Sequence, residues 1–153
     1  MLTIRVDEGK CIECGACRAV CSLGHGIWNG AKQIDCLPEE RVVIKSRSDG
    51  VQIDICRHCE TPVCVNACVA GALNIDGEAG IVKVVPDRCV CCWSCIMECP
   101  FCALRIRSFA WKCDGCSEWD RPLCATYCPT GALTAEKSPR QVSAEKRKKR
   151  MTQ

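Results

Sequence analysis

The sequence predicts an α+β fold of few, short strands and helices that needs more than a hydrophobic core to hold it together. Nineteen of the 153 residues are cysteine, a share typical of disulfide scaffolds and metal-binding proteins. The cysteines recur in four similar blocks, and short β-branched runs flank these blocks. Aromatic residues make up only 5% of the chain, so a core of ordinary size is hard to assemble. Bonds to metal ions would therefore supply much of the free energy of folding.

The N-terminal segment favours metal binding over disulfides. Met1–Lys10 has neither the apolar stretch of a secretory signal nor a twin-arginine motif. We therefore expect a cytoplasmic protein, whose clustered thiols stay reduced and serve as metal ligands or redox groups. No apolar run reaches the ~18 residues that a membrane helix needs, so no membrane span is expected.

Each of the four blocks contains four cysteines at short, fixed spacings. The first is Cys11-x2-Cys14-x2-Cys17-x3-Cys21, and the third is Cys89-x2-Cys92-x2-Cys95-x3-Cys99, followed by Pro100. The second is Cys56-x2-Cys59-x4-Cys64-x3-Cys68, and the fourth is Cys113-x2-Cys116-x7-Cys124-x3-Cys128, followed by Pro129. Recurrence of this kind indicates one structural unit that is repeated along the chain.

The residues that flank the blocks repeat as well. Strands are predicted before three blocks, at Leu2–Val6, Val51–Ile55 and Ile81–Val85, and after three blocks, in the segments that begin at Gly71, Cys102 and Gly131. Each unit is thus expected to contain a strand, a cysteine loop, a short helix and a second strand. A hairpin is predicted over 74–82, and one further strand over Arg41–Lys45.

The spacing of the blocks indicates iron–sulfur clusters. The run Cys-x2-Cys-x2-Cys-x3-Cys-Pro is typical of two-cluster bacterial ferredoxins, in which the fourth cysteine binds the other cluster of the pair. The first and third blocks have this spacing, and the third also has the proline. Structural zinc is the alternative, because it too takes four thiolates, and the fourth block alone would suit a zinc site. Zinc ribbons, however, take their cysteines as separated pairs, which the third block does not offer.

The chain resembles the four-cluster ferredoxin-like electron-transfer subunits of molybdenum and tungsten pterin oxidoreductases, such as aldehyde oxidoreductase, and of carbon monoxide dehydrogenase. The resemblance covers about Val6 to Leu133 and is strongest at KCDGC, from Lys112, and CATYCPTGAL, from Cys124. It implies two pseudo-twofold, cluster-stabilised modules of the bacterial 2[4Fe–4S] type. The inner module is 51–107, the outer module is 1–50 with 108–135, and 136–153 is a basic tail, expected to be disordered or to dock a partner.

The resemblance also implies how sixteen cysteines would hold four [4Fe–4S] clusters. The outer module would use Cys11, Cys14 and Cys17 with Cys128, and Cys113, Cys116 and Cys124 with Cys21. The inner module would use Cys56, Cys59 and Cys64 with Cys99, and Cys89, Cys92 and Cys95 with Cys68. Ser22 and Val69 stand where the family pattern has proline. The adjacent Cys91 leaves the register of the third block open, and Cys92 is chosen because it completes both x2 spacings.

Three cysteines and both histidines are expected to have no role at the clusters. Cys36, Cys91 and Cys102 are interpreted as small apolar packing residues. His58 lies between two predicted ligands, where it could tune a cluster, but a solvated loop position is favoured. His25 is expected in a glycine-rich loop and carries no functional signal.

Bound clusters would change the charge of the chain. The formal charge is +3, and the segment from Glu136 onward carries seven basic and two acidic side chains. A [4Fe–4S] cluster on four thiolates carries about −2, so four clusters bring the chain to about −5, and the body without the tail to about −10. A body of this charge repels phosphate, so no nucleic-acid partner is expected. The basic tail favours a fixed partner or self-association.

The predicted function is therefore the conduction of single electrons. The sequence contains no catalytic triad and no phosphate-binding glycine loop, so it is interpreted as a subunit without catalytic residues or a substrate site. Its partners would be a catalytic oxidoreductase subunit, for example a tungsten or molybdenum pterin enzyme, and a further electron donor or acceptor. A freely diffusing polyferredoxin is one alternative, and a zinc-stapled interaction module is another.

Overall fold

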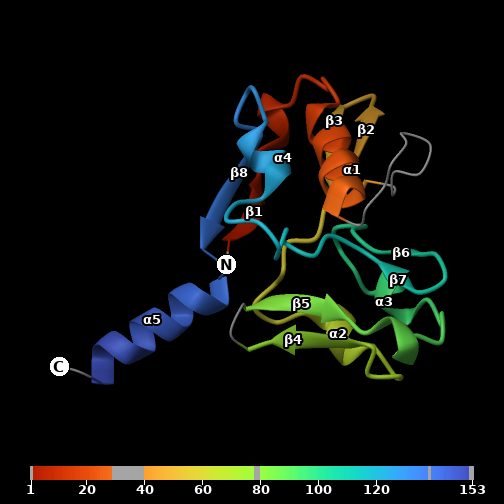
Figure 1. Ribbon diagram of the computed structural model, residues 1–153, viewed down its shortest axis with the longest axis vertical. Helices are drawn as coiled ribbons and strands as arrows, with labels where there is room; N and C mark the ends of the chain where they lie inside the picture. Colours follow the sequence, from red (N-terminus) through yellow and green to blue (C-terminus); the bar gives the residue numbers. More distant parts are fainter. Residues whose placement is uncertain (1, 29–39, 78–79, 138, 152–153) are drawn as a thin grey trace.

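The computed structural model describes residues 2–28, 40–77, 80–137 and 139–151. Within this part of the chain, short helices alternate with four two-stranded sheets (Figure 1). The strands are β1 (Leu2–Val6), β2 (Val43–Arg47), β3 (Gly50–Asp54), β4 (Leu73–Asp76), β5 (Ile81–Val84), β6 (Arg105–Ile106), β7 (Ala110–Trp111) and β8 (Leu133–Lys137). The helices are α1 (Ala16–Trp28), α2 (Val63–Asn66), α3 (Ser94–Met97), α4 (Leu123–Thr126) and α5 (Pro139–Met151), with 3-10 turns at Glu8–Lys10 and Pro86–Arg88.

The predicted strands and the predicted hairpin are confirmed. β4 and β5 pair antiparallel from Leu73↔Val84 to Asp76↔Ile81, as expected for the hairpin. β2 and β3 form a second hairpin, and β2 begins at Val43, two residues later than predicted. The β-branched side chains of these runs favour the pleated, half-buried surface of a strand. The sequence therefore contains local signals for most of the strands.

The first and last strands of the body pair with each other. β1 runs antiparallel to β8, from Leu2↔Lys137 to Val6↔Leu133, and the amide of Asp7 donates to the carbonyl of Ala132 at 2.8 Å. This pairing joins segments about 130 residues apart in the sequence. It brings the first cysteine block, which follows β1, beside the end of the fourth block, which precedes β8.

The described residues pack into two hydrophobic cores. The first core includes Ile4, Val42, Ile53 and Leu133, and Figure 1 shows the surrounding elements β1, β2, β3, β8, α1 and α4 in its upper half. The second core includes Leu73, Val82 and Leu104, among β4, β5, β6, β7, α2 and α3 in the lower half. Buried cysteines belong to both cores, so the thiols line the interior and not only the surface.

Helices α1 and α4 pack closely because a glycine stands at their contact. A Cβ atom on Gly24 of α1 would come within 2.2 Å of Leu123 Cδ1 in α4. Such a distance is shorter than any real contact, so a larger residue would force Leu123 to move. α1 carries Cys17 and Cys21, and α4 carries Cys124. The close approach thus places thiols of the first and fourth blocks near one another.

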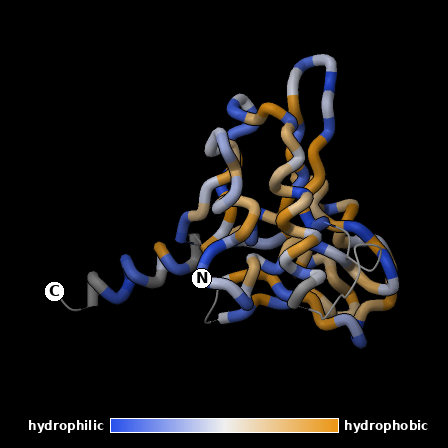
Figure 2. Tube along the Cα trace, turned by 45° about the horizontal axis from the view of Figure 1, so that its top comes forward, coloured by the Kyte–Doolittle hydropathy of each residue, from blue (hydrophilic) through white to orange (hydrophobic). Residues whose placement is uncertain are grey.

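The basic tail, expected to be disordered or to dock a partner, forms helix α5 over residues 139–151, so the first of these alternatives does not hold for that segment and the second stays a prediction. Figure 2 shows α5 as a mostly hydrophilic rod that extends away from the body. Proline suits the first position of a helix, and the following Glu, Lys, Arg and Ala residues are good helix formers. Ser143 donates a hydrogen bond to Glu60 at 2.7 Å, and Lys137 pairs with Glu145. None of the described helices has the length and apolar character required to cross a lipid bilayer.

Candidate metal centres

The four cysteine blocks share one unusual backbone conformation. In each block, the residue just before the second cysteine has a positive φ: 54° at Glu13, 48° at His58, 53° at Cys91 and 74° at Gly115. Only glycine adopts this left-handed region freely, and other residues occupy it at a cost. Three non-glycine residues at matched positions therefore indicate that the same loop is imposed on every block. The sequence repeat is a structural repeat at this position.

A second repeated feature follows the last cysteine of three blocks. The carbonyls of Cys68, Cys99 and Cys128 each accept a hydrogen bond from the amide three residues later, at 3.0, 3.3 and 3.4 Å. The donors Gly71, Cys102 and Gly131 all have positive φ. Cys21 departs from this pattern, because helix α1 continues past it to Trp28. The absence of proline after Cys21 in the sequence is consistent with that continuation.

Backbone amides donate to the cysteine sulfurs. Cys68 Sγ accepts from the amides of Ala72 and Leu73, at 3.2 and 3.4 Å. Four more sulfurs accept at 3.3 to 3.5 Å: Cys21 from Arg41, Cys89 from Ala110, Cys113 from Gly115 and Cys128 from Leu133. Donors aimed at sulfur stabilise a thiolate over a thiol. The backbone is thus arranged to support negatively charged sulfur.

The first cysteine group consists of Cys11, Cys14, Cys17 and Cys128. All four line one cavity, together with apolar residues that include Ile44 and Leu133. Burial raises the pKa of Cys17 to about 11, and the charges of Cys11, Cys128 and Cys14 add to the effect. The structure therefore brings these four predicted ligands together.

The second group consists of Cys56, Cys59, Cys64 and Cys99. Burial raises the pKa of Cys64 to about 11, and the charges of Cys56 and Cys99 raise it further. The pKa of Cys59 is raised by burial and then by the same two neighbours. Cys99 comes from the third block in sequence, so this group joins two blocks.

The third group consists of Cys68, Cys89, Cys92 and Cys95, which line a second apolar cavity. Burial, followed by the charges of Cys68, Cys89 and Cys92, raises the pKa of Cys95. Cys92 is the one exposed cysteine of this group. Trp93, which lines the same cavity, is 57% exposed.

The fourth group consists of Cys21, Cys113, Cys116 and Cys124, all of them buried. Burial raises the pKa of Cys116 to about 11, with smaller contributions from Asp114 and Cys21. Burial and then the charges of Cys116 and Cys21 raise the pKa of Cys124. Burial also raises the pKa of Cys113. The structure thus gathers this set as well.

The donor sets fit a thiolate-bound metal centre. Four thiols that raise one another's pKa cannot all ionise in an apolar site unless a cationic centre binds them. The cavities lined by the first and third groups are apolar, and four thiolates at one such site suit a [4Fe–4S] cluster. Zinc also takes four thiolates, so the spacing of the cysteine blocks, and not the cavities, favours the cluster.

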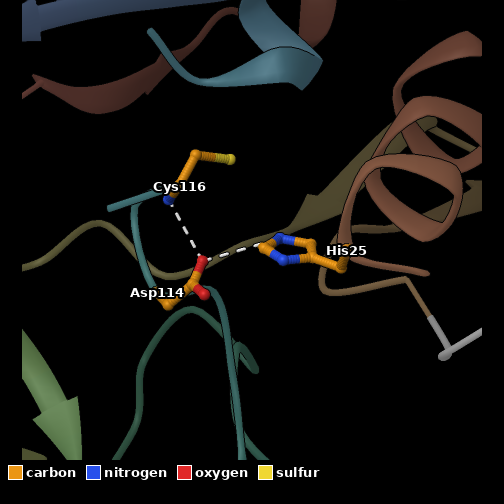
Figure 3. Close-up of side chains that lie close together, drawn as sticks. All are labelled: His25, Asp114 and Cys116. Atoms are coloured by element: carbon orange, nitrogen blue, oxygen red, sulfur yellow. Dashed lines mark hydrogen bonds and ion pairs between the residues drawn. The ribbon is translucent and has the colours of Figure 1, made fainter. Parts of the chain in front are cut away.

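A polar network borders the fourth group (Figure 3). Asp114 forms an ion pair with Arg41, accepts the amide of Cys116 at 3.1 Å, and lies 3.6 Å from His25 Nε2. Burial acts to raise the pKa of Asp114, but the charges of Arg41 and then His25 hold it below its usual value. His25 packs edge-on against Trp119, with ring centroids 5.1 Å apart. Oxygen, nitrogen and sulfur atoms of His25, Asp114 and Cys116 converge within 4.8 Å.

Two buried polar residues lie between the second and fourth groups. His58 is fully buried, and its Nδ1 accepts the amide of Val82 in β5 at 3.1 Å. The expectation of a solvated His58 was wrong, because β5 covers the loop that carries it. Burial, and then the charge of Lys112, lowers the pKa of His58 to about 3. Lys112 is only 5% exposed and donates through Nζ to the carbonyl of Cys113 at 2.6 Å.

Of the unassigned cysteines, Cys102 differs from its expected packing role because it is exposed. Cys91 is partly buried, lines the apolar cavity of the third group, and donates to the carbonyl of Ser108 at 3.4 Å. Both hold left-handed positions of a repeated loop. Cys36 lies outside the described residues. His25, expected in a loop, is buried in α1.

Three residues of the site were missed by sequence reasoning. Lys112 and Asp114 lie within KCDGC, and their place beside predicted ligands is the signal in the sequence that points to them. No feature of the sequence around Arg41 points to the site, because only folding brings this residue close to Asp114. Its guanidinium also lies 4.5 Å from the ring centroid of Trp111.

The register of the third block can be tested directly. Cys91 occupies the left-handed loop position that Glu13, His58 and Gly115 occupy elsewhere, which favours Cys92 as the ligand. Cys92→Ser is expected to lose or weaken one cluster, with up to about a quarter of the iron, whereas Cys91→Ala retains the full iron content. Iron per chain after anaerobic purification is the measurement. The reverse result would assign the thiolate to Cys91.

The strained position of Cys102 allows a prediction about stability. Gly71 and Gly131 hold the equivalent position after two other blocks, at φ 61° and 68°, and Cys102 has φ 47°. Cys102→Gly is expected to stabilise the protein by about 1 kcal/mol, because it removes the strain of a left-handed side chain. Anaerobic thermal unfolding measures the effect, and Gly71→Ala should destabilise the protein by a similar amount. Loss of iron from Cys102→Gly would show that this thiol binds a cluster.

Comparisons with known proteins give concordant matches. Residues 51–138 match the family described as "4Fe-4S dicluster domain". The chain is 32% identical to "Electron transport protein HydN" of Escherichia coli (strain K12), covering 95% of each chain. It is 33% identical to "Thiosulfate reductase electron transfer subunit PhsB" of Salmonella typhi, over 83% of this chain and 71% of that protein. It is also 32% identical to "NADH-dependent phenylglyoxylate dehydrogenase subunit beta" of Aromatoleum evansii, over 86% of this chain but only 29% of that longer protein.

Proposed function

The chain belongs to the 4Fe–4S dicluster family of iron–sulfur electron-transfer proteins, and we propose that it conducts single electrons through four clusters on the four cysteine groups. When bound, each cluster supplies one-electron redox chemistry at a nearly fixed geometry. The protein provides four thiolates per site, amide donors to sulfur, and apolar walls that limit contact with water. The single observation that supports this best is the assembly of sixteen predicted ligands into four groups of four.

The contacts between groups support a linear order. The charge of Cys17, in the first group, raises the pKa of Cys124, in the fourth. The charge of Cys56, in the second group, does the same to Cys113, in the fourth. Cys64 of the second group and Cys95 of the third lie in one core. We therefore propose the order first, fourth, second, third, in which the first and third groups are the ends.

The two ends are the groups that contain an exposed cysteine, whereas Cys59 and Cys99 of the second group are only partly buried. Cys14 in the first group and Cys92 in the third are exposed, whereas Cys113 and Cys124 in the fourth are buried. Apolar residues surround both ends: Ile12 beside the first group, and Val90 with Trp93 beside the third, are each more than half exposed. Exposed apolar residues at a redox site suit contact with another protein. We propose that these ends dock a catalytic oxidoreductase subunit and a second redox partner.

We also propose that the chain forms two ferredoxin-like modules, each with two of the four clusters. The two hydrophobic cores and the β1–β8 pairing support an outer module of 1–50 with 108–135 and an inner module of 51–107. Hairpin β2–β3 spans the boundary at residue 50, and Ile53 packs in the first core. Hairpin β6–β7 spans the boundary at residue 107, and Ala110 packs in the second core. We therefore assign the first hairpin as a whole to the outer module and the second to the inner module.

Reductive coulometry on anaerobically purified protein tests the proposed function. Four clusters should take up about four electrons per chain, one each. An uptake of only two electrons by intact, iron-containing protein would show that two of the four groups hold no cluster. A zinc-stapled module would take up none. A freely diffusing polyferredoxin would give the same electron count, but it would not co-purify with a catalytic subunit at high salt.

A further inference from the structure

His58 occupies a buried and strained position between two cysteine groups. It follows Cys56 and precedes Cys59 in the second group, and its φ of 48° lies in the left-handed region. At the matched positions of the other loops stand Glu13, an exposed residue, Cys91 and Gly115. Only the second loop thus places a fully buried imidazole at this position. Strain of this kind persists where the surrounding structure holds the residue in place.

A backbone hydrogen bond fixes the tautomer of His58. The amide of Val82 donates to Nδ1 at 3.1 Å, so Nδ1 carries a lone pair and no proton. A neutral imidazole with a free Nδ1 must carry its proton on Nε2. His58 therefore presents an Nε2–H donor inside the protein.

This donor has no partner among the residues that the structure describes. His58 Nε2 is buried and forms no hydrogen bond there. Buried donors in native proteins are almost always satisfied, and leaving one unpaired is costly. The nearby carboxylate of Asp114 already binds Arg41 and the amide of Cys116. His58 stands in the loop between Cys56 and Cys59, so anionic sulfur of the second group is an acceptor that suits this donor.

We propose that His58 donates Nε2–H to an anionic sulfur of the cluster held by the second group, and so raises the reduction potential of that cluster. The acceptor is a bridging sulfide or a cysteine thiolate. A donor to sulfur stabilises the more negative, reduced state over the oxidised state. The inference rests on the proposed function, because it requires a cluster at the second group. It adds one side-chain donor to the amide donors found at other cysteines.

Three substitutions separate the donor from the other roles of His58. His58→Leu removes both nitrogens, and His58→Asn keeps an acceptor for the Val82 amide but removes the donor at the Nε2 position. His58→Gln places an amide N–H near the Nε2 position. Cys91→Ala, at the matched position of the third block, is the control. The readout is an EPR-monitored potentiometric titration of the holoprotein.

Loss of the donor should lower one midpoint potential and leave the other three in place. At a fixed solution potential, His58→Leu and His58→Asn should reduce the ratio of reduced to oxidised cluster by about three- to tenfold, or ~30 to ~60 mV at 59 mV per tenfold change. His58→Gln should recover most of the shift, and Cys91→Ala should cause none. Equal potentials in His58→Asn and the unmodified protein, at full iron content, would overturn the inference.

Measurements on the unmodified protein keep the inference testable if the variants fail to fold. Resonance Raman spectra in H2O and D2O should differ in iron–sulfide modes if the acceptor is a sulfide, or in iron–thiolate modes if it is a thiolate. Labelling of histidine with 15N in the same unmodified protein should alter those modes as well, which separates the Nε2–H of His58 from the backbone amides that also donate to sulfur. No histidine-dependent shift in either set of modes would refute the hydrogen bond. Protein without iron and sulfide would instead refute the proposed function itself.

Discussion

Replacing Lys112 by methionine is expected to lower the reduction potential of the cluster on the second cysteine group. Lys112 is buried, and its charge acts on Cys64 of that group. A unit charge at about 6 Å, with an effective dielectric constant near 20, contributes about 3 kcal/mol, which is on the order of 100 mV for one electron. The measurement is the midpoint potential of each cluster. Lys112→Arg should retain most of the effect, because it keeps the charge.

Lys83→Met provides the matched control for Lys112→Met. It removes the same charge from a half-exposed side chain of β5 that pairs with Asp76. Solvent screens an exposed charge, so the four potentials should stay close to those of the unmodified protein. Equal shifts in both variants would show that net charge, and not the buried position of Lys112, sets the potential.

Replacing Arg41 by glutamine is expected to destabilise the protein by about 2 to 3 kcal/mol, since it leaves the carboxylate of Asp114 without its ion pair beside an anionic group. The side chain of Arg41 is 13% exposed and that of Asp114 is 34% exposed, so the loss should be smaller than for a fully buried pair. The contact between Arg41 and Trp111 is lost as well. Anaerobic denaturant unfolding, followed by the loss of cluster absorbance, measures the change.

A double-mutant cycle separates the ion pair from general damage. Asp114→Asn removes the charge that Arg41 compensates, so Arg41→Gln should cost much less stability in that background. The amide of Cys116 can still donate to the side-chain oxygen of asparagine. If the effects of the two substitutions simply add, Arg41 and Asp114 do not stabilise the protein through their contact.

Local signals in the sequence were enough to predict most of the strands, though not β7, and the positions of the cysteine loops. β1 and the β4–β5 hairpin follow from β-branched runs, which favour strands wherever they occur. The cysteine blocks follow from spacing, because a cluster requires its thiolates at short intervals along a loop. The family match and the relatives agree with the iron–sulfur interpretation.

The features that were missed depend on contacts between distant segments. His58 is buried because β5, some 24 residues later, covers it. Arg41 reaches Asp114 only after the chain between them has folded. Neither contact has a local signature. Helix α5 was not predicted, because a charged segment without apolar periodicity was expected to be disordered or to dock a partner, although its residues individually favour helix.

The backbone of the loops was also beyond prediction from residue type. A left-handed φ is expected at Gly71, Gly115 and Gly131, and it is found there. The same conformation at Cys102 could be inferred only by aligning its block with the others. Alignment of the repeated blocks thus predicts a left-handed backbone conformation at Cys102 that its residue type alone does not.

The proposed function depends on four [4Fe–4S] clusters bound by sixteen cysteines, and metal analysis is its direct test. Iron, acid-labile sulfide and zinc should be measured per chain on anaerobically purified protein, with visible spectra before and after dithionite. We expect about sixteen iron and sixteen sulfide, with a brown colour that bleaches on reduction. Stoichiometric zinc without sulfide, in protein whose spectrum dithionite does not change, would show that the chain is not an electron carrier of this kind.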